Sequence, residues 1–477
     1  MRQSRLARLA LVFGLVLVGV SSAYAQGGSA TSSITGTVLD SSGGAIPGAT
    51  VVVTGAAGGS FTAFTNAQGV FALPSMNPGT YTVTVTLSGF KTAVVSDVRL
   101  LPGQPFDVKV QLEIGQIEET ITVATSAEII NTQTATVSST LNADQLNRMP
   151  SVTRNALNAI IFLPGVNTPT TNRNSTVNGL PESFLYITLD GVTNQDNFNK
   201  TTDGFFASVY PRQDAVEAVT VTTAATGANQ GGSGAVSINF VTRSGTNQYS
   251  GSAYEYYRNP AMNTNYWFNE NAGLPKNEIR LHQFGARFGG PIVANRAFFF
   301  AHYEHLRFPN SFTRTRTTFA DEVLDGWFPY AVSGNTRRVN VLQLAAANGQ
   351  ISAIDPVVLR TLTSIKNSLT TTGAVSATTD PLRNSYEWQS PGTLTEHQPT
   401  VRLDVNLNER HRLSGSGQVI WAMRDPDYLN SADARFPGAP NYRVFRSTRP
   451  LYSATLRSTL GADMVNEVRL GLTARWT

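Results

Sequence analysis

Alternating apolar and polar residues recur through the C-terminal half of the chain, and this pattern restricts the fold more than any other feature of the sequence. Apolar residues occupy every second position from Val401 to Leu407 and again from Val468 to Trp476. A period of two places neighbouring side chains on opposite faces of a β-strand. Turn-forming residues at 408–411 join the first of these strands to the next. One apolar face toward lipid and one polar face toward a wet lumen are typical of a transmembrane antiparallel β-barrel, although a soluble sandwich can show similar alternation.

The N-terminus has the pattern of an export signal. Three arginines within the first eight residues precede an apolar run over residues 9–20, and small residues at positions 23 and 25 follow. We therefore expect residues 1–25 to be a signal peptide cleaved between Ala25 and Gln26. The alternative is a membrane anchor, but about 12 apolar residues are too few to span a bilayer.

The composition excludes several classes of protein. The chain has no cysteine, so disulfide scaffolds, cysteine-ligated zinc and thiol catalysis are excluded, as is lipoprotein processing. The formal net charge is only +4, with no basic block outside the signal, so nucleic-acid binding is not expected. No later stretch is long and apolar enough for a transmembrane helix. The length of 477 residues favours two or three domains.

A small β-sandwich is predicted over residues 30–115. Two β-rich runs at 34–39 and 49–54 flank a cluster of turn formers, and residues 81–87 alternate between apolar side chains and threonine. About 85 residues with some seven short strands are typical of such a sandwich.

The same segment resembles the carboxypeptidase regulatory-like family. The matching motifs are Gly36-x-Val38-x-Asp40, Gly44-x-Ile46-Pro47-Gly48-Ala49-x-Val51, Thr65-Asn66-x-x-Gly69-x-Phe71, Pro78-Gly79-x-Tyr81-x-Val83 and Gly89-Phe90. The resemblance implies a prealbumin-like sandwich of the carbohydrate-binding-like superfamily, which serves as an accessory module without catalysis. Either a sugar-binding role or a folded spacer is consistent with the sequence.

A short β-branched segment follows at residues 116–125. It resembles the TonB box, an extended segment that pairs with the energy-transducing protein TonB in the periplasm. A β-branched run flanked by acidic residues is suited to adding as a strand to an exposed sheet edge. The residues expected to contact TonB are Glu119, Thr120, Ile121, Thr122 and Val123.

Residues 126–243 are predicted to form an α+β domain. Short helices are expected at 144–150 and 154–163, and a strand at 186–190. The order of the motifs resembles the plug domain of TonB-dependent receptors. The matching motifs are Leu163-Pro-Gly-Val166, Leu189-Asp-Gly-Val192 and Thr242-Arg-Ser-Gly245. Ala215-Val216 and a polar insert at 227–233 depart from the usual pattern, and they point to the Oar-like branch of the family.

Two catalytic interpretations fail on geometry. The glycines at 231–234 are followed by neither Lys-Ser/Thr nor a helix, so they are no phosphate-binding loop. His302 and His305 flank Glu304, but on a strand these two histidines point to opposite faces and do not form a zinc site. We expect no enzyme activity, no metal and no cofactor.

The remaining residues, 246–477, are predicted to form a partial outer-membrane barrel. Polar stretches at 312–330 and 367–391 are interpreted as extracellular loops. An aromatic group is expected to form an interface girdle, with ligand contact as the alternative; it comprises Tyr254, Tyr256, Tyr257, Tyr266, Trp267 and Phe268. Roughly 230 residues give about ten strands, whereas a plugged transporter barrel has about 22, so the sequence indicates a C-terminally truncated chain.

Together these patterns predict a mainly β protein of the outer membrane: a sandwich, a plug domain and part of a barrel. The resemblance implies active transport of a large or scarce ligand (a glycan, siderophore or peptide). The partners implied are TonB with ExbB and ExbD, outer-membrane lipid and an extracellular ligand. An outer-membrane adhesion or surface-organising protein and a soluble periplasmic sugar-binding protein are the alternatives.

Overall fold

The computed structural model describes most of the chain after residue 31, and it is mainly β as predicted. The described residues are 32–55, 58–76, 78–101, 105–115, 120–123, 137–149, 153–168, 175–180, 184–195, 206–224, 236–369, 372–408, 410–460 and 464–477. The predicted signal peptide, with Ala25 and Gln26, lies outside them. No helix among the described residues is long and apolar enough to cross a membrane.

The N-terminal region is a sandwich of two sheets, ordered β4-β1-β7 and β3-β2-β5-β6-β8. Its first seven strands are β1 (Ser32–Asp40), β2 (Thr50–Gly55), β3 (Ser60–Phe64), β4 (Val70–Met76), β5 (Gly79–Thr86), β6 (Thr92–Leu100) and β7 (Phe106–Leu112). In β5, Tyr81, Val83 and Val85 are buried, and the threonines between them are half-buried. The predicted alternation is therefore confirmed, and it supplies one side of the apolar core between the sheets.

The predicted turn after β1 is built on Asp40. Its Oδ1 accepts hydrogen bonds from the backbone N–H groups of Ser42 and Gly44, each at 2.8 Å. Hydrogen bonds from Ser42 and Gly44 lower the pKa of Asp40 below its ordinary value. Gly48 follows with φ at +75°, a conformation that favours glycine. This turn reverses the chain toward β2.

Strand β8 (Thr120–Val123) joins the sandwich at an edge. Its backbone pairs in parallel with β6, with Thr120 opposite Thr92 and Val123 opposite Val95. Four of the five residues predicted to contact TonB thus form an edge strand, while Glu119 lies outside the described residues. The structure therefore places this segment as a strand on the sandwich.

A central unit follows, with a five-stranded sheet ordered β13-β12-β15-β14-β9. Its elements are β9 (Val137–Asn142), α2 (Ala143–Arg148), η1 (Ala156–Phe162), β10 (Val166–Asn167), β11 (Thr176–Val177), β12 (Leu185–Leu189), β13 (Val192–Thr193), η4 (Gln213–Ala215), β14 (Val216–Ala224) and β15 (Val236–Thr242). The Asn142 side chain accepts from the backbone N–H of Gln145, and the Gln145 side chain accepts from the backbone N–H of Asn142. This capping box explains why α2 begins where it does.

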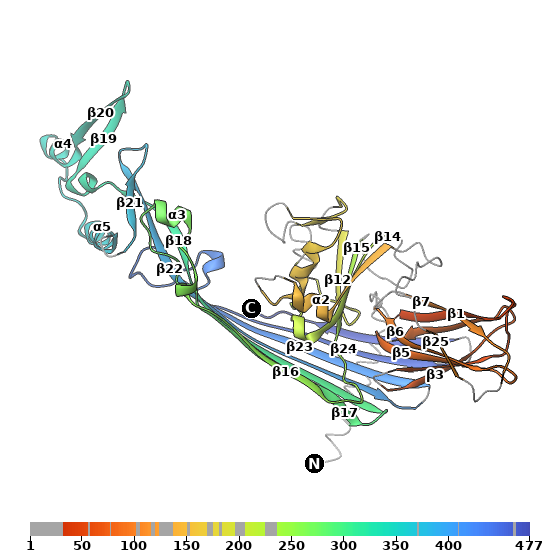
Figure 1. The fold of residues 1–477 in the computed structure, drawn as a ribbon. Coiled ribbons are helices and arrows are strands. Elements are labelled where there is room, and N and C mark those ends of the chain that lie inside the picture. Colours follow the sequence, from red (N-terminus) through yellow and green to blue (C-terminus); the bar gives the residue numbers. More distant parts are fainter. Residues whose placement is uncertain are drawn as a thin grey trace, which may run out of the picture.

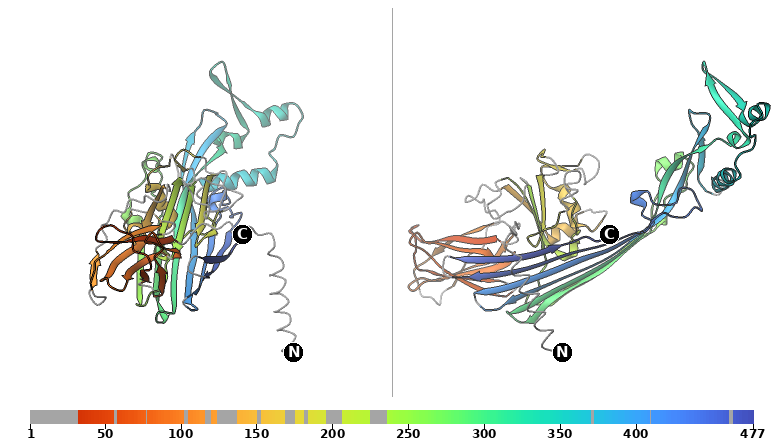
Figure 2. Two further views of the ribbon diagram at one scale, coloured as in Figure 1. Left: turned by 90° about the vertical axis from the view of Figure 1, so that its right-hand side faces the viewer. Right: turned by 180° about the vertical axis from the view of Figure 1, so that it is seen from behind.

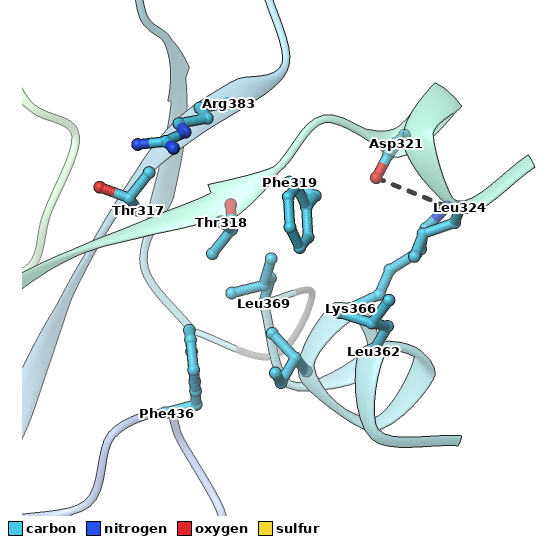
Figure 3. A pocket seen from close by; sticks show the side chains of 11 residues that line it. Thr317, Thr318, Phe319, Asp321, Leu324, Leu362, Lys366, Leu369, Arg383 and Phe436 are labelled. Carbon is cyan, nitrogen blue, oxygen red and sulfur yellow. Dashed lines mark ion pairs between the residues drawn. The ribbon is translucent and has the colours of Figure 1, made fainter. Parts of the chain in front are cut away.

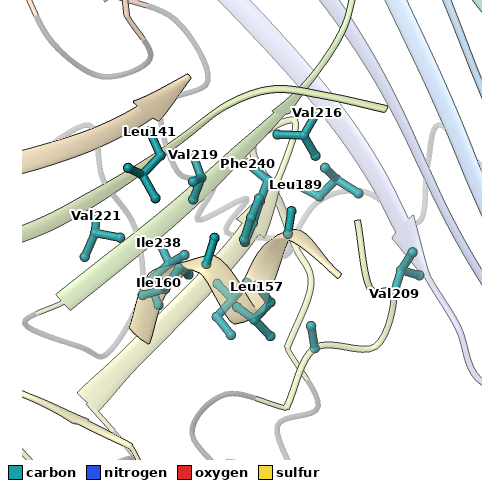
Figure 4. Close-up of a cluster of buried hydrophobic side chains, with 14 of the residues drawn as sticks. Leu141, Leu157, Ile160, Leu189, Val209, Val216, Val219, Val221, Ile238 and Phe240 are labelled. Atoms are coloured by element: carbon teal, nitrogen blue, oxygen red, sulfur yellow. The ribbon is translucent and has the colours of Figure 1, made fainter. Parts of the chain in front are cut away.

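The core of the central unit lies between its sheet and η1. Leu157 and Ile160 of η1 pack toward Ile238 and Phe240 of β15 (Figure 4). The helix predicted over 154–163 is present, but it is a 3-10 helix. The predicted polar insert at 227–233 lies outside the described residues.

The C-terminal half is an antiparallel sheet in chain order, β16-β17-β18-β22-β23-β24-β25. These strands are β16 (Ser250–Arg258), β17 (Leu281–Val293), β18 (Ala297–Phe319), β22 (Arg383–Asn406), β23 (His411–Asp425), β24 (Phe445–Thr459) and β25 (Val465–Thr473). The sheet curves but does not close, and β16 and β25 are its edges (Figures 1 and 2).

Alternate residues of the barrel sheet face opposite sides, as predicted. In β18, His302 and Glu304 are buried on the inner face, whereas Tyr303 and His305 lie on the outer face. The structure therefore confirms that His302 and His305 point in opposite directions.

The interpretation of the polar stretches as loops is wrong in part. Ten strands lie between residues 250 and 473 of the described chain, about as many as expected, and eight of them belong to the barrel sheet; β18 and β22 are much longer than the others, with 23 and 24 residues. Both strands continue far into the stretches interpreted as loops, and they remain paired out to Phe319 and Arg383. Both faces of a strand in water can be polar, so the apolar alternation disappears while the strand continues.

An extended insertion connects the ends of β18 and β22. It contains η6 (Asp321–Asp325), β19 (Trp327–Val332), β20 (Asn335–Asn340), α4 (Val341–Ala347), α5 (Pro356–Leu369) and β21 (Ala374–Ala377). Shorter elements lie between other strands: η5 (Pro260–Met262), α3 (Trp267–Asn271) and η7 (Tyr428–Asn430). Short turns join the strands at the opposite end, where the sandwich lies (Figure 1). In outer-membrane barrels, which this part of the chain is predicted to form, the short turns are periplasmic, so we expect the insertion on the extracellular side.

Candidate functional site

The central unit meets the inner face of the barrel sheet through buried charged residues. Arg154 precedes η1 and Arg212 precedes η4, so the two arginines lie at the starts of short helices. Glu304 on β18 and Glu396 on β22 project from the barrel sheet toward them, and both are buried. The loops of one unit and the strands of the other thus contribute opposite charges to one cluster.

Arg212 makes the closest contacts with the barrel. Its Nε lies 3.0 Å from Glu304 Oε1 and donates to Gln398 at 2.7 Å. Its terminal nitrogen donates to Glu396 Oε2 at 2.7 Å. One guanidinium therefore connects two neighbouring barrel strands to the central unit, using the fork geometry that suits arginine better than lysine.

Arg154 binds within its own unit and against the barrel. It pairs with Asp214, and its Nε lies 3.5 Å from Glu304 Oε2. The rings of Tyr254 and Tyr256 lie 4.4 and 4.6 Å from its guanidinium carbon. Burial opposes the charge, but Asp214 and the tyrosines beside it raise the pKa of Arg154. Arg154 is therefore held as a cation.

This arrangement corrects the girdle interpretation for part of the aromatic group. Tyr254 faces inward and donates to Glu304 Oε2 at 2.6 Å, and Tyr256 also faces Arg154. Tyr266, Trp267 and Phe268 lie at α3, in the connection between β16 and β17, and are exposed. Tyr257 alone of the six lies on the outer face, with its ring 4.9 Å from that of His282.

A second cluster joins two of the sequence motifs. Asp190 accepts from the backbone N–H of Thr242 at 2.9 Å and from its hydroxyl at 2.8 Å. Arg402 on β22 donates to the Thr242 carbonyl at 2.9 Å and to Asp404 Oδ2 at 2.9 Å. The Asp-Gly turn and the strand leading into the barrel are thus fixed to each other and to the barrel wall.

The local backbone explains the Asp-Gly pair. Asp190 has φ at +49° and Gly191 has φ at +75°. Aspartate tolerates this left-handed region better than most residues, and glycine has no steric cost there. The turn ends β12 and directs the Asp190 carboxylate toward Thr242 and toward Ser416, which donates to it at 2.6 Å.

The contacts give an interface whose strength depends on complete pairing. Replacing a well-paired buried ion pair with apolar groups is often neutral, whereas removing one partner costs about 3–5 kcal/mol. The arrangement therefore specifies one orientation of the central unit, which a smaller apolar contact with Ile420 and Leu451 of the barrel wall would not do alone, because apolar burial is non-directional. An arrangement of this kind can hold one element against another in a defined orientation.

A separate cavity lies in the extracellular insertion, between α5 and the outer ends of β18 and β22. It has a volume of about 310 Å³ and is lined by Phe319, Leu324, Leu362, Ile365, Leu369 and Phe436 on its apolar side. Lys366 and Arg383 lie at its rim, and Lys366 Nζ is 3.5 Å from Asp321 (Figure 3). An apolar cavity with a few charged groups has the composition of a small-molecule or side-chain site.

The sequence and the structure identify different residues. The TonB-box prediction falls on β8 and on Glu119, which lies outside the described residues, and it stays a prediction. Sequence reasoning singled out Asp190 and Thr242 as parts of two motifs but did not bring them together. It missed Arg212, Glu304 and Glu396 as a cluster; isolated charges at inward positions of predicted strands were the available signal.

Comparison with protein families identifies two domains. Residues 241–477 match the outer membrane beta barrel domain, and residues 33–113 match the carboxypeptidase regulatory-like domain. Both matches agree with the resemblance and the fold class predicted from the sequence.

Comparison with individual proteins gives partial matches. The chain is 27% identical over 314 residues to the TonB-dependent transporter Oar of Myxococcus xanthus, covering 62% of this chain and 28% of that protein. A ferric enterobactin receptor of Pseudomonas aeruginosa is 12% identical, with a TM-score of 0.40 over 70% of this chain and 40% of the receptor. A siderophore receptor of the same organism is 13% identical, with a TM-score of 0.26 over 71% of this chain and 58% of the receptor.

Proposed function

We propose, from the premise that this chain is an Oar-like TonB-dependent receptor of the outer membrane, that it serves active uptake of a large or scarce ligand. In this proposal the central unit is a plug that occludes the barrel. TonB pulls on residues 119–123, using the inner-membrane proton gradient through ExbB and ExbD. The chain spans less than a third of the relative that it matches, so the uptake is a function of the complete receptor.

The buried charged interface between the central unit and the barrel sheet carries the proposal. Arg154 and Arg212 on one side meet Glu304 and Glu396 on the other. A structural domain that never moves gains more stability from apolar packing, since buried ion pairs contribute little net free energy. Polar groups can exchange their partners for water when the two surfaces separate, so this interface suits a plug that must be displaced.

Strand β8 supports the role of the TonB-contact segment. Residues 120–123 are extended and lie at the edge of their sheet, paired on one side with β6. Strand addition uses main-chain hydrogen bonds and requires an extended segment of this kind. Along the chain, β9 is the first described strand of the central unit after this segment, so a pull on the segment would reach β9 first.

The extracellular cavity is the place where we propose that ligand first binds. More than half of its lining residues are apolar, and Arg383, which pairs with Asp380 at 3.3 Å, is among the polar ones. A peptide side chain or the aromatic group of a siderophore would bury apolar area against Phe319 and Leu362, whereas the hydroxyl groups of a glycan could pair only with the polar minority of the lining, such as Thr317, Thr318 and Asp321. We therefore favour a peptide or an aromatic siderophore over a glycan.

The TonB contact can be tested by disulfide crosslinking, because the chain has no cysteine of its own. The substitution Thr122→Cys, in cells that carry TonB with a single cysteine, should give a crosslinked species that disappears on reduction. Ser138→Cys on β9 is the matched control outside the segment. A Thr122→Cys yield no higher than that of Ser138→Cys, in every TonB cysteine position tried, would contradict the proposed mechanism.

The extracellular projection favours a second function, adhesion or organisation of the cell surface. Strands β19 and β20 form a hairpin at the far end of the insertion (Figure 2), and Trp327 stacks with Arg338 while Phe328 and Tyr330 are exposed. Exposed aromatic side chains on such a hairpin suit contact with another macromolecule. Deleting residues 327–340 should abolish adhesion under this alternative and leave the TonB crosslink unchanged.

A further inference from the structure

The outer face of the barrel sheet ends in a charged row at its extracellular side. Register places residues on adjacent strands in lateral rows, and the outward rows from Ala297 to Tyr303 contain no charged residue. Exposed apolar side chains fill these rows, including Val401, Leu403, Tyr452, Leu456, Leu470 and Leu472. From Ala297 to His305, β18 covers about nine residues, which is the length needed to cross the hydrocarbon core. The boundary with the lipid headgroups therefore falls at His305.

Two successive rows at this boundary form what we call the boundary patch. On strands β18, β22, β23 and β24 its outward positions are His305, His397, Trp421 and Thr448 in one row and Arg307, Thr395, Met423 and Arg446 in the next. None of the eight residues is acidic. The patch combines an amphipathic ring, two imidazoles and two guanidinium groups where a bilayer changes from acyl chains to headgroups.

The two histidines are held together in the first row. Their Nδ1 atoms lie 3.3 Å apart, and the Tyr303 hydroxyl lies 2.7 Å from His397 Nδ1. The two imidazole rings have their centroids 4.5 Å apart. Placing an imidazole group in hydrocarbon costs free energy unless its polar atoms have hydrogen-bond partners. Their mutual contact and that with Tyr303 locate them at the polar edge of the band.

Arg307 and Arg446 are exposed, and neither forms an ion pair with any residue that the structure describes. On the inner side of the sheet, Arg402 of β22 and Arg212 of the central unit each contact two carboxylates. The outward Arg307 and Arg446 have no such partners among the described residues and are open to an external anion.

The neighbouring outward carboxylates do not serve these arginines. Glu255 lies two strands from β18 and contacts His282 at 3.4 Å. Asp425 lies one row further from the membrane, opposite Thr393. Strands are spaced by about 4.8 Å, so Arg307 and Arg446, three strands apart, are separated by about 14 Å at their backbones. Two long side chains across this gap can contact one headgroup that carries phosphate.

We infer that the boundary patch binds the phosphate of an anionic lipid in the outer leaflet, with Arg307 and Arg446 on the phosphate and Trp421 beside the acyl chains. Guanidinium groups bind phosphate through paired, charge-assisted hydrogen bonds. This inference rests on the outer-membrane location and the strand register, and it is independent of transport and of TonB. The lipid would then be held at one position on the outer surface of the barrel sheet, beside the histidine pair.

The test compares two lipids on the protein purified from outer membranes in detergent. Native mass spectrometry would measure the affinity for a bisphosphorylated glycolipid and for the same lipid after dephosphorylation. The double substitution R307Q/R446Q should weaken binding of the phosphorylated lipid by about 30-fold, since each arginine near such a surface contributes about fivefold. Binding of the dephosphorylated lipid should not change.

The matched control is R337Q/R338Q on β20, which removes the same charge far from the lipid-facing side. It should leave both affinities unchanged. Equal affinity of the unsubstituted protein for the two lipids would overturn the inference, and so would an equal loss in the control. The first comparison needs no variant, so the inference is testable even if R307Q/R446Q fails to fold.

Discussion

The central unit has two faces of opposite chemistry. Between its sheet and η1, Leu157, Ile160 and Phe240 form a core without charges. Toward the barrel, Arg212 and Asp190 contact acidic and polar groups of the barrel wall, beside a smaller apolar contact with Ile420 and Leu451. The first face holds the unit together in any surroundings because apolar burial is non-directional. The second holds it in one orientation and depends on every partner being present, so it sets position rather than bulk stability.

The largest expected effect is the loss of Arg212. The substitution Arg212→Met leaves Glu304 and Glu396 buried without their closest cation, which should weaken attachment of the central unit to the barrel by about 3–5 kcal/mol. Hydrogen exchange of the β14 and β15 amides would measure the loss. The control Arg243→Met, whose contact with Glu217 is 3.7 Å and partly exposed, should have a much smaller effect. Equal effects would show that the charged interface does not position the unit.

A somewhat smaller effect is expected in the apolar core. Leu157 is 2% exposed, so Leu157→Ala should destabilise the central unit by about 3 kcal/mol through lost burial and a cavity. Here local unfolding of η1 and β15 should increase, again read by hydrogen exchange, while barrel strands β22 and β23 keep their protection. Phe162→Ala, at a half-exposed position of the same helix, is the control. If the amides of β22 and β23 also lost their protection from hydrogen exchange, the apolar core and the barrel contact would unfold together rather than independently.

A substitution in the Asp-Gly turn should lower the free energy of unfolding by about 2 kcal/mol. Asp190→Asn keeps the shape of the side chain but removes the charge that accepts from Thr242 and Ser416 and faces Arg402. Charge-assisted hydrogen bonds contribute about 1.5–3 kcal/mol each, and the amide retains part of that. The loss of stability would be measured by unfolding in urea, with protease cleavage within residues 236–245 as the readout. If the unfolding free energies of the variant and the unsubstituted protein differed by less than about 0.5 kcal/mol, the Asp190 cluster would not position the central unit.

The smallest effect is expected on the sandwich surface. Lys91 and Glu113 are 3.5 Å apart and partly exposed. Glu113→Gln should therefore change the unfolding free energy by less than about 0.5 kcal/mol, since exposed pairs contribute little. Thermal unfolding at low and high salt would measure it. A loss comparable to that of Arg212→Met would contradict the distinction between buried and exposed pairs drawn above.

Sequence patterns located the strands well where one face is apolar. The alternation over 401–407 and 468–476 gave β22 and β25, and that over 81–87 gave β5. The patterns did not reveal that β18 and β22 continue to Phe319 and Arg383, because alternation requires an apolar environment on one side.

The aromatic group near β16 shows a second limit. Tyr254 and Tyr257 have the same residue type and are three positions apart, so on a strand they face opposite sides. Composition suggested one girdle for both. Only the tertiary structure shows the difference. It pairs β16 with β17 and packs Arg154, about 100 residues earlier in the chain, against Tyr254.

The sequence by itself determined the mainly β class, the alternating barrel strands and the glycine-rich turns, because these depend on residues that are neighbours along the chain. The tertiary structure alone decided which charges meet. Arg212 is separated from Glu304 and Glu396 by long stretches of chain, and nothing in its local sequence distinguishes it from a solvated arginine. Only the packing of the central unit against the barrel sheet removes water from these groups, and burial is what makes their pairing matter.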